Sequence, residues 1–160
     1  FPEGTYPFSI YAWSYVGLNP MFRVVPVCEN DLLATELTDI LQEADTSSSV
    51  CTVGKGTWDG LEAKHITLWR LEKEAYLAGI QNTANYKLES ISSNYRNRRR
   101  TLEQKIRDAF DEKIRRMYQS ELNTATERYQ LKVDEINDRT SRADIHTALI
   151  TNGVIEVKRG

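Results

Sequence analysis

The chain has 160 residues, of which 40% are hydrophobic and 28% are charged, and its net charge is −2. That length suits one domain, or a small domain with an appendage, and the apolar content is enough for a core, so wholesale disorder is excluded. No run approaches the roughly 18 apolar residues that a membrane-spanning helix needs, so no such helix is expected.

The charges are distributed unevenly along the chain. Residues 1–60 carry a net charge of −6, residues 61–100 carry +4, and residues 101–160 are neutral as a group. The small net charge therefore hides a basic middle segment, which bears on the choice of partners. The chain begins at Phe1 with no basic stretch ahead of an apolar one, so we expect no signal peptide, a cytoplasmic location and a longer parent protein.

Two strands are predicted at the start of the chain. Residues 8–16 are rich in aromatic and branched side chains and present two apolar faces, which is typical of a strand covered on both sides. Turn-forming residues at 17–20 separate this strand from a second one at residues 21–28. Pro26 cannot donate a hydrogen bond to a neighbouring strand, which favours an edge position or a bulge.

An amphipathic helix is predicted at residues 31–44, because apolar residues recur there at helical spacing, with Asn30 or Asp31 as its cap. Residues 45–60 are rich in Ser, Thr and Gly and are predicted to form a linker. Residues 54–57 of this linker (Gly-Lys-Gly-Thr) partly match a phosphate-binding loop. The first glycine of that motif is missing and no helix is expected to open directly on it, so we interpret it as a turn.

A pair of long helices is predicted between residues 61 and 142, because this stretch has no proline, one glycine and two apolar stripes of helical period. A single helix of that length could not cover its stripe, so we expect the chain to fold back as an antiparallel coiled coil. We place the turn near residues 96–101, where Thr101 and Gln104 match a capping box. Residues 108–111 are the alternative site of the turn.

A β-hairpin is predicted at the end of the chain. Asn152 and Gly153 separate two apolar runs at residues 145–151 and 154–158, and Asn-Gly favours a type I′ turn between paired strands. That turn would require positive φ at both central residues.

The predicted fold class is α+β. Residues 1–60 and 143–160 would form a base domain, in which a small antiparallel sheet packs against one helix. Residues 61–142 would project from it as a long antiparallel helical hairpin.

Neither a metal site nor a catalytic group is predicted. Cys28 and Cys51 lack the spacing of a zinc or redox motif and are expected to be reduced rather than joined in a disulfide. His65 and His146 both fall on apolar stripes and are interpreted as packed residues. The carboxylates lie three or four positions from Lys or Arg, as on a solvated helix face. We therefore expect a chain that is not an enzyme and that has no cofactor.

The most informative feature is a basic cluster at residues 96–116, which hold nine basic and four acidic side chains, a net charge of +5. Its basic members are Arg96, Arg98, Arg99, Arg100, Lys105, Arg107, Lys113, Arg115 and Arg116. Guanidinium groups match phosphate oxygens, and binding releases counterions, so we predict that this cluster contacts duplex nucleic acid. The alternatives are a protein partner, or a solvated tip with no partner.

Six strings occur in an order and spacing that resemble one known family. They are FSIYAW at residues 8–13, VVPVC at 24–28, EKIRRM at 112–117, SEL at 120–122, ADIH at 143–146 and NGVIEV at 152–157. Together they resemble the far C-terminal region of bacterial helicase-like ATPases of the switch/sucrose-non-fermenting type, within the broader DEAD/DEAH-like class.

The resemblance implies a non-catalytic accessory domain in a parent that hydrolyses ATP to move along duplex nucleic acid or to displace bound proteins. The ATPase motifs would lie upstream, and no helicase residue carries over to this chain. The domain would brace the ATPase lobes, grip the duplex or dock a client protein such as RNA polymerase. The alternative is a structural or assembly module whose coiled coil binds protein or itself.

Overall fold

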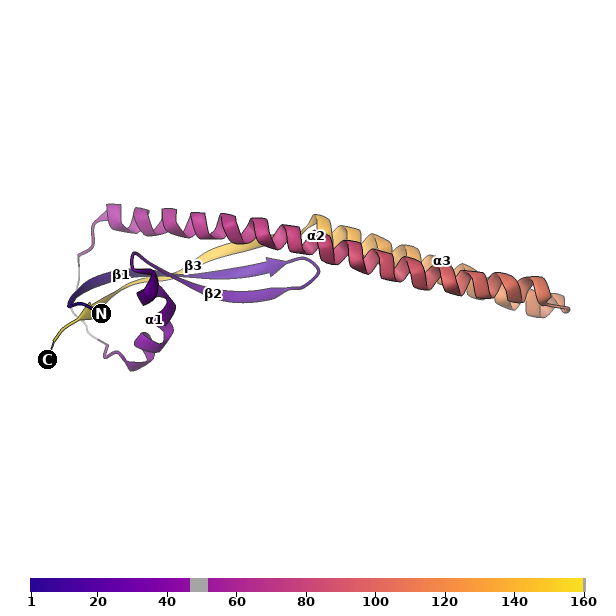
Figure 1. The fold of residues 1–160 in the computed structure, drawn as a ribbon, viewed down its shortest axis with the longest axis horizontal. Coiled ribbons are helices and arrows are strands. Elements are labelled where there is room, and N and C mark those ends of the chain that lie inside the picture. The colour runs from indigo at the N-terminus through magenta and orange to yellow at the C-terminus, as the bar shows by residue number, and fades with distance from the viewer. Residues whose placement is uncertain (47–51, 160) are drawn as a thin grey trace. The chain divides into compact units, whose positions relative to one another are not determined.

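The computed structural model describes residues 1–46 and 52–159, and Figure 1 shows its ribbon. In chain order the elements are β1 (Gly4–Val16), β2 (Met21–Cys28), α1 (Asp31–Glu43), α2 (Lys55–Asp108), α3 (Glu112–Ser141) and β3 (Asp144–Val157). A three-stranded antiparallel sheet is accompanied by helices, so the predicted α+β class is confirmed. No helix in the described ranges is long and apolar enough to cross a membrane.

The chain divides into two compact units. The first comprises Phe1–Ala75 and Asp144–Gly160, and we call it the sheet unit because it contains all three strands, together with α1 and the first part of α2. The second comprises Tyr76–Ala143, and we call it the two-helix unit because it consists of the rest of α2 and of α3. The pair of long helices predicted from the two apolar stripes is therefore present as α2 and α3.

The sheet has the strand order β2-β1-β3, and β1 pairs antiparallel with both of its neighbours. β1 takes the central place because it has apolar side chains on both faces. Phe8 on one face and Trp13 on the other are both buried. Pro26 lies opposite Ile10 on β2, which is an edge strand, so the edge position predicted from this proline is confirmed.

One face of the sheet packs against α1, which begins after Asn30. The Asn30 side chain accepts hydrogen bonds from the backbone N–H groups of Leu32 and Leu33 at 3.0 and 3.2 Å, so Asn30 rather than Asp31 is the cap. Leu33 and Leu37 belong to the apolar stripe of α1 and are buried against the sheet. The buried residues of this core are Phe8, Cys28, Leu33, Leu37 and Ile155.

The first part of α2 packs on the opposite face of the sheet. Trp13 donates an indole N–H hydrogen bond to Nε2 of His65 at 2.8 Å, and the His65 ring stacks on Tyr11 with 3.5 Å between centroids. Trp69 donates to the backbone oxygen of Ile145 at 2.9 Å, which ties α2 to β3. His65 is 4% exposed, so its packing is confirmed, but it packs against the sheet and not in the seam between the long helices as the apolar stripe predicted. Burial lowers the pKa of this imidazole.

The other histidine and the cysteines have different environments. His146 is not packed as predicted: its side chain is 67% exposed, 3.7 Å from the Asp144 carboxylate. The reason is its place on the edge strand β3 opposite Ser14, which is itself exposed. Cys28 is a buried free thiol in the core, whereas Cys51 lies outside the described residues.

The predicted C-terminal hairpin is wrong, because β3 is a single strand that pairs with β1 along almost its whole length. Gly153 lies opposite Phe8, and the glycine with positive φ in the described ranges is Gly17, not Gly153. Asn152 is bound to β1 through its side-chain oxygen, which accepts a hydrogen bond from Ser9 at 2.6 Å. Pairing the whole of this segment with β1 forms more inter-strand hydrogen bonds than folding it on itself around a two-residue loop would. The pairing with β1 therefore overrides the local turn preference of Asn-Gly.

The start of α2 also differs from the prediction. The helix begins at Lys55, so residues 55–60 are helical rather than part of a linker, and a helix does open on the Gly-Lys-Gly-Thr segment. The backbone N–H of Thr57 bonds to the oxygen of Gly54 at 3.0 Å in this first turn. Part of the predicted linker, residues 47–51, lies outside the described residues.

The turn between the long helices is not at residues 96–101, which are helical, but within the alternative site at 108–111. The Thr101 hydroxyl donates to the backbone oxygen of Asn97 at 3.1 Å, which is the bond of a threonine inside a helix and not that of a cap. Asp111 is the real cap, since its side chain accepts a hydrogen bond from the backbone N–H of Lys113 at 2.9 Å.

The two-helix unit has a sparsely buried seam. On α2 the side chains of Ile80, Ala84 and Leu102 are buried, whereas no described residue of α3 is. Tyr95 and Tyr129 stack across the seam with 4.4 Å between ring centroids and 2° between ring planes. Other apolar residues of the two helices, such as Leu88, Tyr129 and Val133, are only half-buried, so the unit depends on a few well-buried contacts.

Candidate nucleic-acid interface

The nine predicted cations lie at the end of the two-helix unit where α2 turns into α3. Six of them belong to the last turns of α2 and three to the first turns of α3, on either side of residues 109–111. Arg96 lies twelve residues before the end of α2, a distance of about 18 Å along a helix. The four arginines at 96–100 therefore lie along α2 and not at its tip, which corrects their predicted place.

Three of these arginines are paired with carboxylates of their own helix. Arg99 donates to Glu103 at 2.9 Å, and this hydrogen bond raises the pKa of the Arg99 guanidinium. Glu112 accepts from Arg115 at 2.8 Å and lies 3.7 Å from Arg116. All these pairs are solvent-exposed, so they contribute little to stability, but they reduce the charge that a ligand meets.

The other six cations have no acidic partner in the described part of the chain. Arg96, Arg98, Arg100 and Lys113 make no ion pair or hydrogen bond there through their side chains. The remaining two have neutral partners: Lys105 lies over the Tyr118 ring at 5.4 Å, and Arg107 donates to the amide oxygen of Gln104 at 2.7 Å. These six side chains therefore keep their full positive charge available to solvent or to a ligand.

Helix geometry separates the five α2 cations that have no acidic partner into two groups. At about 100° per residue, Arg96, Arg100 and Arg107 fall within about 40° of one another and form a stripe. Arg98 and Lys105 lie on another side of α2. There Arg98 lines a groove between the helices, and both side chains line a second hollow beside it. The unit thus offers cations on an outer helix stripe and along an inter-helical groove.

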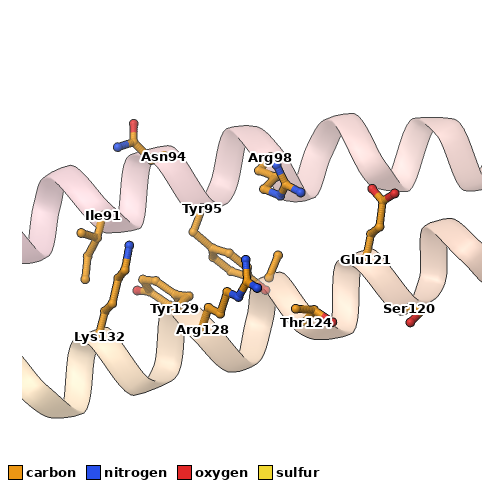
Figure 2. Close-up of a pocket in the computed structure, with 11 residues that line it drawn as sticks. Ile91, Asn94, Tyr95, Arg98, Ser120, Glu121, Thr124, Arg128, Tyr129 and Lys132 are labelled. Carbon is orange, nitrogen blue, oxygen red and sulfur yellow. The ribbon is translucent and has the colours of Figure 1, made fainter.

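The groove has a volume of about 510 Å³ and is drawn in Figure 2. Its lining residues are Ile91, Asn94, Tyr95, Arg98, Ser120, Glu121, Thr124, Ala125, Arg128, Tyr129 and Lys132. Three of them are cations, Arg98 from α2 and Arg128 and Lys132 from α3, and one is a carboxylate, Glu121. A second hollow shares Arg98 and Glu121 with it and is also lined by Lys105.

Arg128 and Lys132 were not predicted as site residues, because the turn was misplaced. The Tyr95 hydroxyl is hydrogen-bonded to the Thr126 hydroxyl at 2.8 Å, which reports the actual register of the two helices. In that register the part of α3 around Arg128 lies beside the part of α2 around Arg98. Placing the turn at the alternative site 108–111 would have brought these cations together from the sequence alone.

The described ranges, residues 1–46 and 52–159, contain many carboxylates and both histidines. No group of three or more His, Cys, Asp or Glu side chains is arranged there to hold a metal ion. Comparison with protein-family models, with curated proteins and with solved structures finds no match to this chain. The charges and the geometry of the two-helix unit are therefore the features that indicate its function.

Proposed function

We propose that the two-helix unit binds the phosphate backbone of duplex nucleic acid through its basic end. The observation that carries the proposal is the set of six cations without an acidic partner, which lie within one stretch of the two helices. Phosphate contacts of this kind position a protein on a duplex and carry no sequence information. Binding is expected to be sensitive to salt and indifferent to sequence.

The distribution of the cations supports a backbone contact rather than a buried anion site. Arg96, Arg100 and Arg107 are spread along about 16 Å of helix, which spans several phosphates of a strand whose rise is about 3.4 Å per base pair. Their side chains are exposed, and so is that of Arg98 at the mouth of the groove. Arginine suits this role because its planar fork pairs with two phosphate oxygens.

The resemblance of the sequence to helicase-like ATPases suggests the kind of longer protein to which this chain would belong. The chain would be a non-catalytic C-terminal accessory region of a bacterial, ATP-dependent, helicase-like protein, whose ATPase lobes bind and hydrolyse ATP elsewhere. In such a protein the accessory region holds the parent on its duplex, or docks a client protein, and needs no cofactor of its own. The helicase-like parent protein is inferred from the resemblance, whereas the phosphate contact is inferred from the arrangement of charges.

The test is the salt dependence of duplex binding by charge variants. Arg96→Ala/Arg100→Ala removes two cations without partners from one stripe of α2. A matched control, Arg139→Ala/Arg142→Ala, also removes two arginines, but these pair with Glu135 and Asp138 on α3, outside the basic cluster. Loss of two phosphate contacts should lower the slope of log K against log salt by about 1.8, and the control should leave it unchanged.

Fluorescence anisotropy with duplexes of unrelated sequence, at several salt concentrations, measures this slope. Circular dichroism establishes that each variant keeps its helices. Equal losses of affinity in the two double variants would mean that general charge, and not this cluster, attracts the duplex. If the affinity of the unsubstituted chain for a duplex does not change with salt concentration, the phosphate contact is refuted.

A second candidate is an assembly module, which α3 favours because none of its described residues is buried. Ile114, Met117 and Leu131 are each at least two-fifths exposed, so α3 has apolar surface to offer to a protein partner or to a second copy. Association through such a surface would persist at high salt, where phosphate contacts are lost. Sedimentation of the chain alone at high salt distinguishes the two functions: a concentration-dependent oligomer favours assembly.

A further inference from the structure

Phe110 lies in the turn between α2 and α3, and its side chain is fully exposed, at 105% of the reference area. Helical spacing predicts this residue on the apolar stripe of the coiled coil, but the actual turn removes it from the seam. Burying a phenylalanine stabilises a folded protein, and Phe110 makes no such contribution. An aromatic ring held wholly in solvent therefore invites a functional explanation.

The backbone around Phe110 is held in place although its ring is not. Arg115 donates from its guanidinium to the backbone oxygen of Ala109 at 3.0 Å, which bridges the turn. Asp111 caps α3 through its side chain. The ring is therefore presented from an ordered turn, with the cations Arg107 and Lys113 three residues away on each side.

The size of this end of the two-helix unit limits what the ring can reach on nucleic acid. Each helix is about 10–12 Å across and neighbouring helices lie about 8–10 Å apart, so the end is about 20 Å wide. The major groove of B-DNA is about 12 Å wide and the minor groove about 6 Å. To stack on a base inside a duplex, the ring would have to open a base step, which costs free energy of unstacking. An unpaired base offers its face without that cost, so it is the favoured partner of a ring exposed at this end.

We propose that Phe110 stacks on an unpaired nucleobase while the neighbouring cations hold the adjoining phosphates. This inference rests on the proposed function and narrows its ligand to nucleic acid with a single-stranded stretch beside the duplex. Stacking on an aromatic side chain tolerates any base, which agrees with a site that reads no sequence. A basic surface with an exposed ring would also suit an anionic membrane, but the cations continue about 18 Å away from the turn, farther than a ring dipping into a lipid headgroup layer requires.

The experiment compares two probes that differ in one feature: a blunt duplex, and the same duplex with a single-stranded overhang whose first unpaired base is 2-aminopurine. Phe110→Ala removes the ring, and Phe110→Leu keeps apolar bulk without a π face. Tyr86→Ala is the matched control, because Tyr86 is a 75% exposed aromatic residue elsewhere on α2 of the same unit.

For the overhang probe we expect both Phe110 variants to bind roughly five- to a hundredfold more weakly. The same variants should bind the blunt duplex as tightly as the unsubstituted chain does, with an unchanged slope of log K against log salt. Tyr86→Ala should bind both probes as the unsubstituted chain does. The parent should alter the 2-aminopurine fluorescence of the overhang, and Phe110→Ala should not.

The failures are distinguishable. If the parent binds neither probe in a salt-dependent way, the proposed function fails, and this inference fails with it. If the parent binds both probes but Phe110→Ala changes neither the affinity nor the 2-aminopurine signal, the stacking role is refuted while the backbone contact stands. If Phe110→Ala loses binding only to vesicles of phosphatidylserine and phosphatidylcholine, the ring serves a membrane and the inference is overturned.

Discussion

Substituting Gly153 by alanine should destabilise the sheet unit, because a β-carbon there has no space. An ideal Cβ at Gly153 would overlap Cζ of Phe8 and lie 2.8 Å from Cε1 of the same ring, closer than Cβ atoms approach other atoms in proteins. Phe8 is 6% exposed and packs in the core beneath α1. The ring must leave its place, or the two strands must separate.

The expected cost follows from what Phe8 loses. Displacing a buried phenylalanine forfeits about 1.5–3 kcal/mol of burial, and complete loss of its packing costs about 3–5 kcal/mol in core truncations. We therefore expect Gly153→Ala to lower the free energy of unfolding by about 2–3 kcal/mol. Once Phe8→Ala has emptied the space, the same substitution should be neutral or should stabilise by up to about 1 kcal/mol, since alanine orders a strand better than glycine.

A double-mutant cycle in urea, followed by tryptophan fluorescence, measures this coupling. Trp13 and Trp69 both lie in the sheet unit and report its unfolding. A coupling energy of about 2–4 kcal/mol between positions 8 and 153 supports the packing argument. If Gly153 instead needed the positive φ of a hairpin turn, its substitution would cost about 1–2 kcal/mol with or without the Phe8 ring, and that result would refute the reasoning.

The remaining predictions concern one buried titratable group and one buried seam position. Because burial lowers the pKa of His65, the unfolded chain binds a proton that the folded chain resists; stability should be complete above about pH 6.5 and fall as the pH drops below it. Urea midpoints on either side of that pH should differ for the parent and much less for His65→Gln, whose amide oxygen can still accept from Trp13; an equal slope in the variant would assign the acid sensitivity to other groups. Ile80→Asp puts an unpaired charge at a 4% exposed position of the two-helix unit and should abolish much of the helical circular dichroism, whereas Ile80→Val should cost only about 0.5–1.5 kcal/mol.

The elements whose signals are local can be predicted from the order of the amino acids alone. The strand at 21–28, the helix that follows Asn30, the edge position of Pro26 and the existence of two long helices were all predictable. Each of these depends on residues a few positions apart, on a side-chain cap, a missing N–H donor or an apolar repeat. The number of basic residues at 96–116 is likewise a property of the sequence alone.

How those elements pack together depends on contacts between residues that are far apart in the chain. Asn152-Gly153 is a strong hairpin signal, yet β1 pairs with β3 along almost its whole length. Position 153 then lies so close to the Phe8 ring that only glycine, which has no β-carbon, fits there. The turn between the helices has no Gly or Pro to mark it, so the register of α2 on α3 depends on contacts about thirty residues apart, such as the bond between Tyr95 and Thr126. That register places Arg128 beside Arg98 and turns Phe110 out into solvent, because side chains far apart in sequence are neighbours only once the chain has chosen where to fold back.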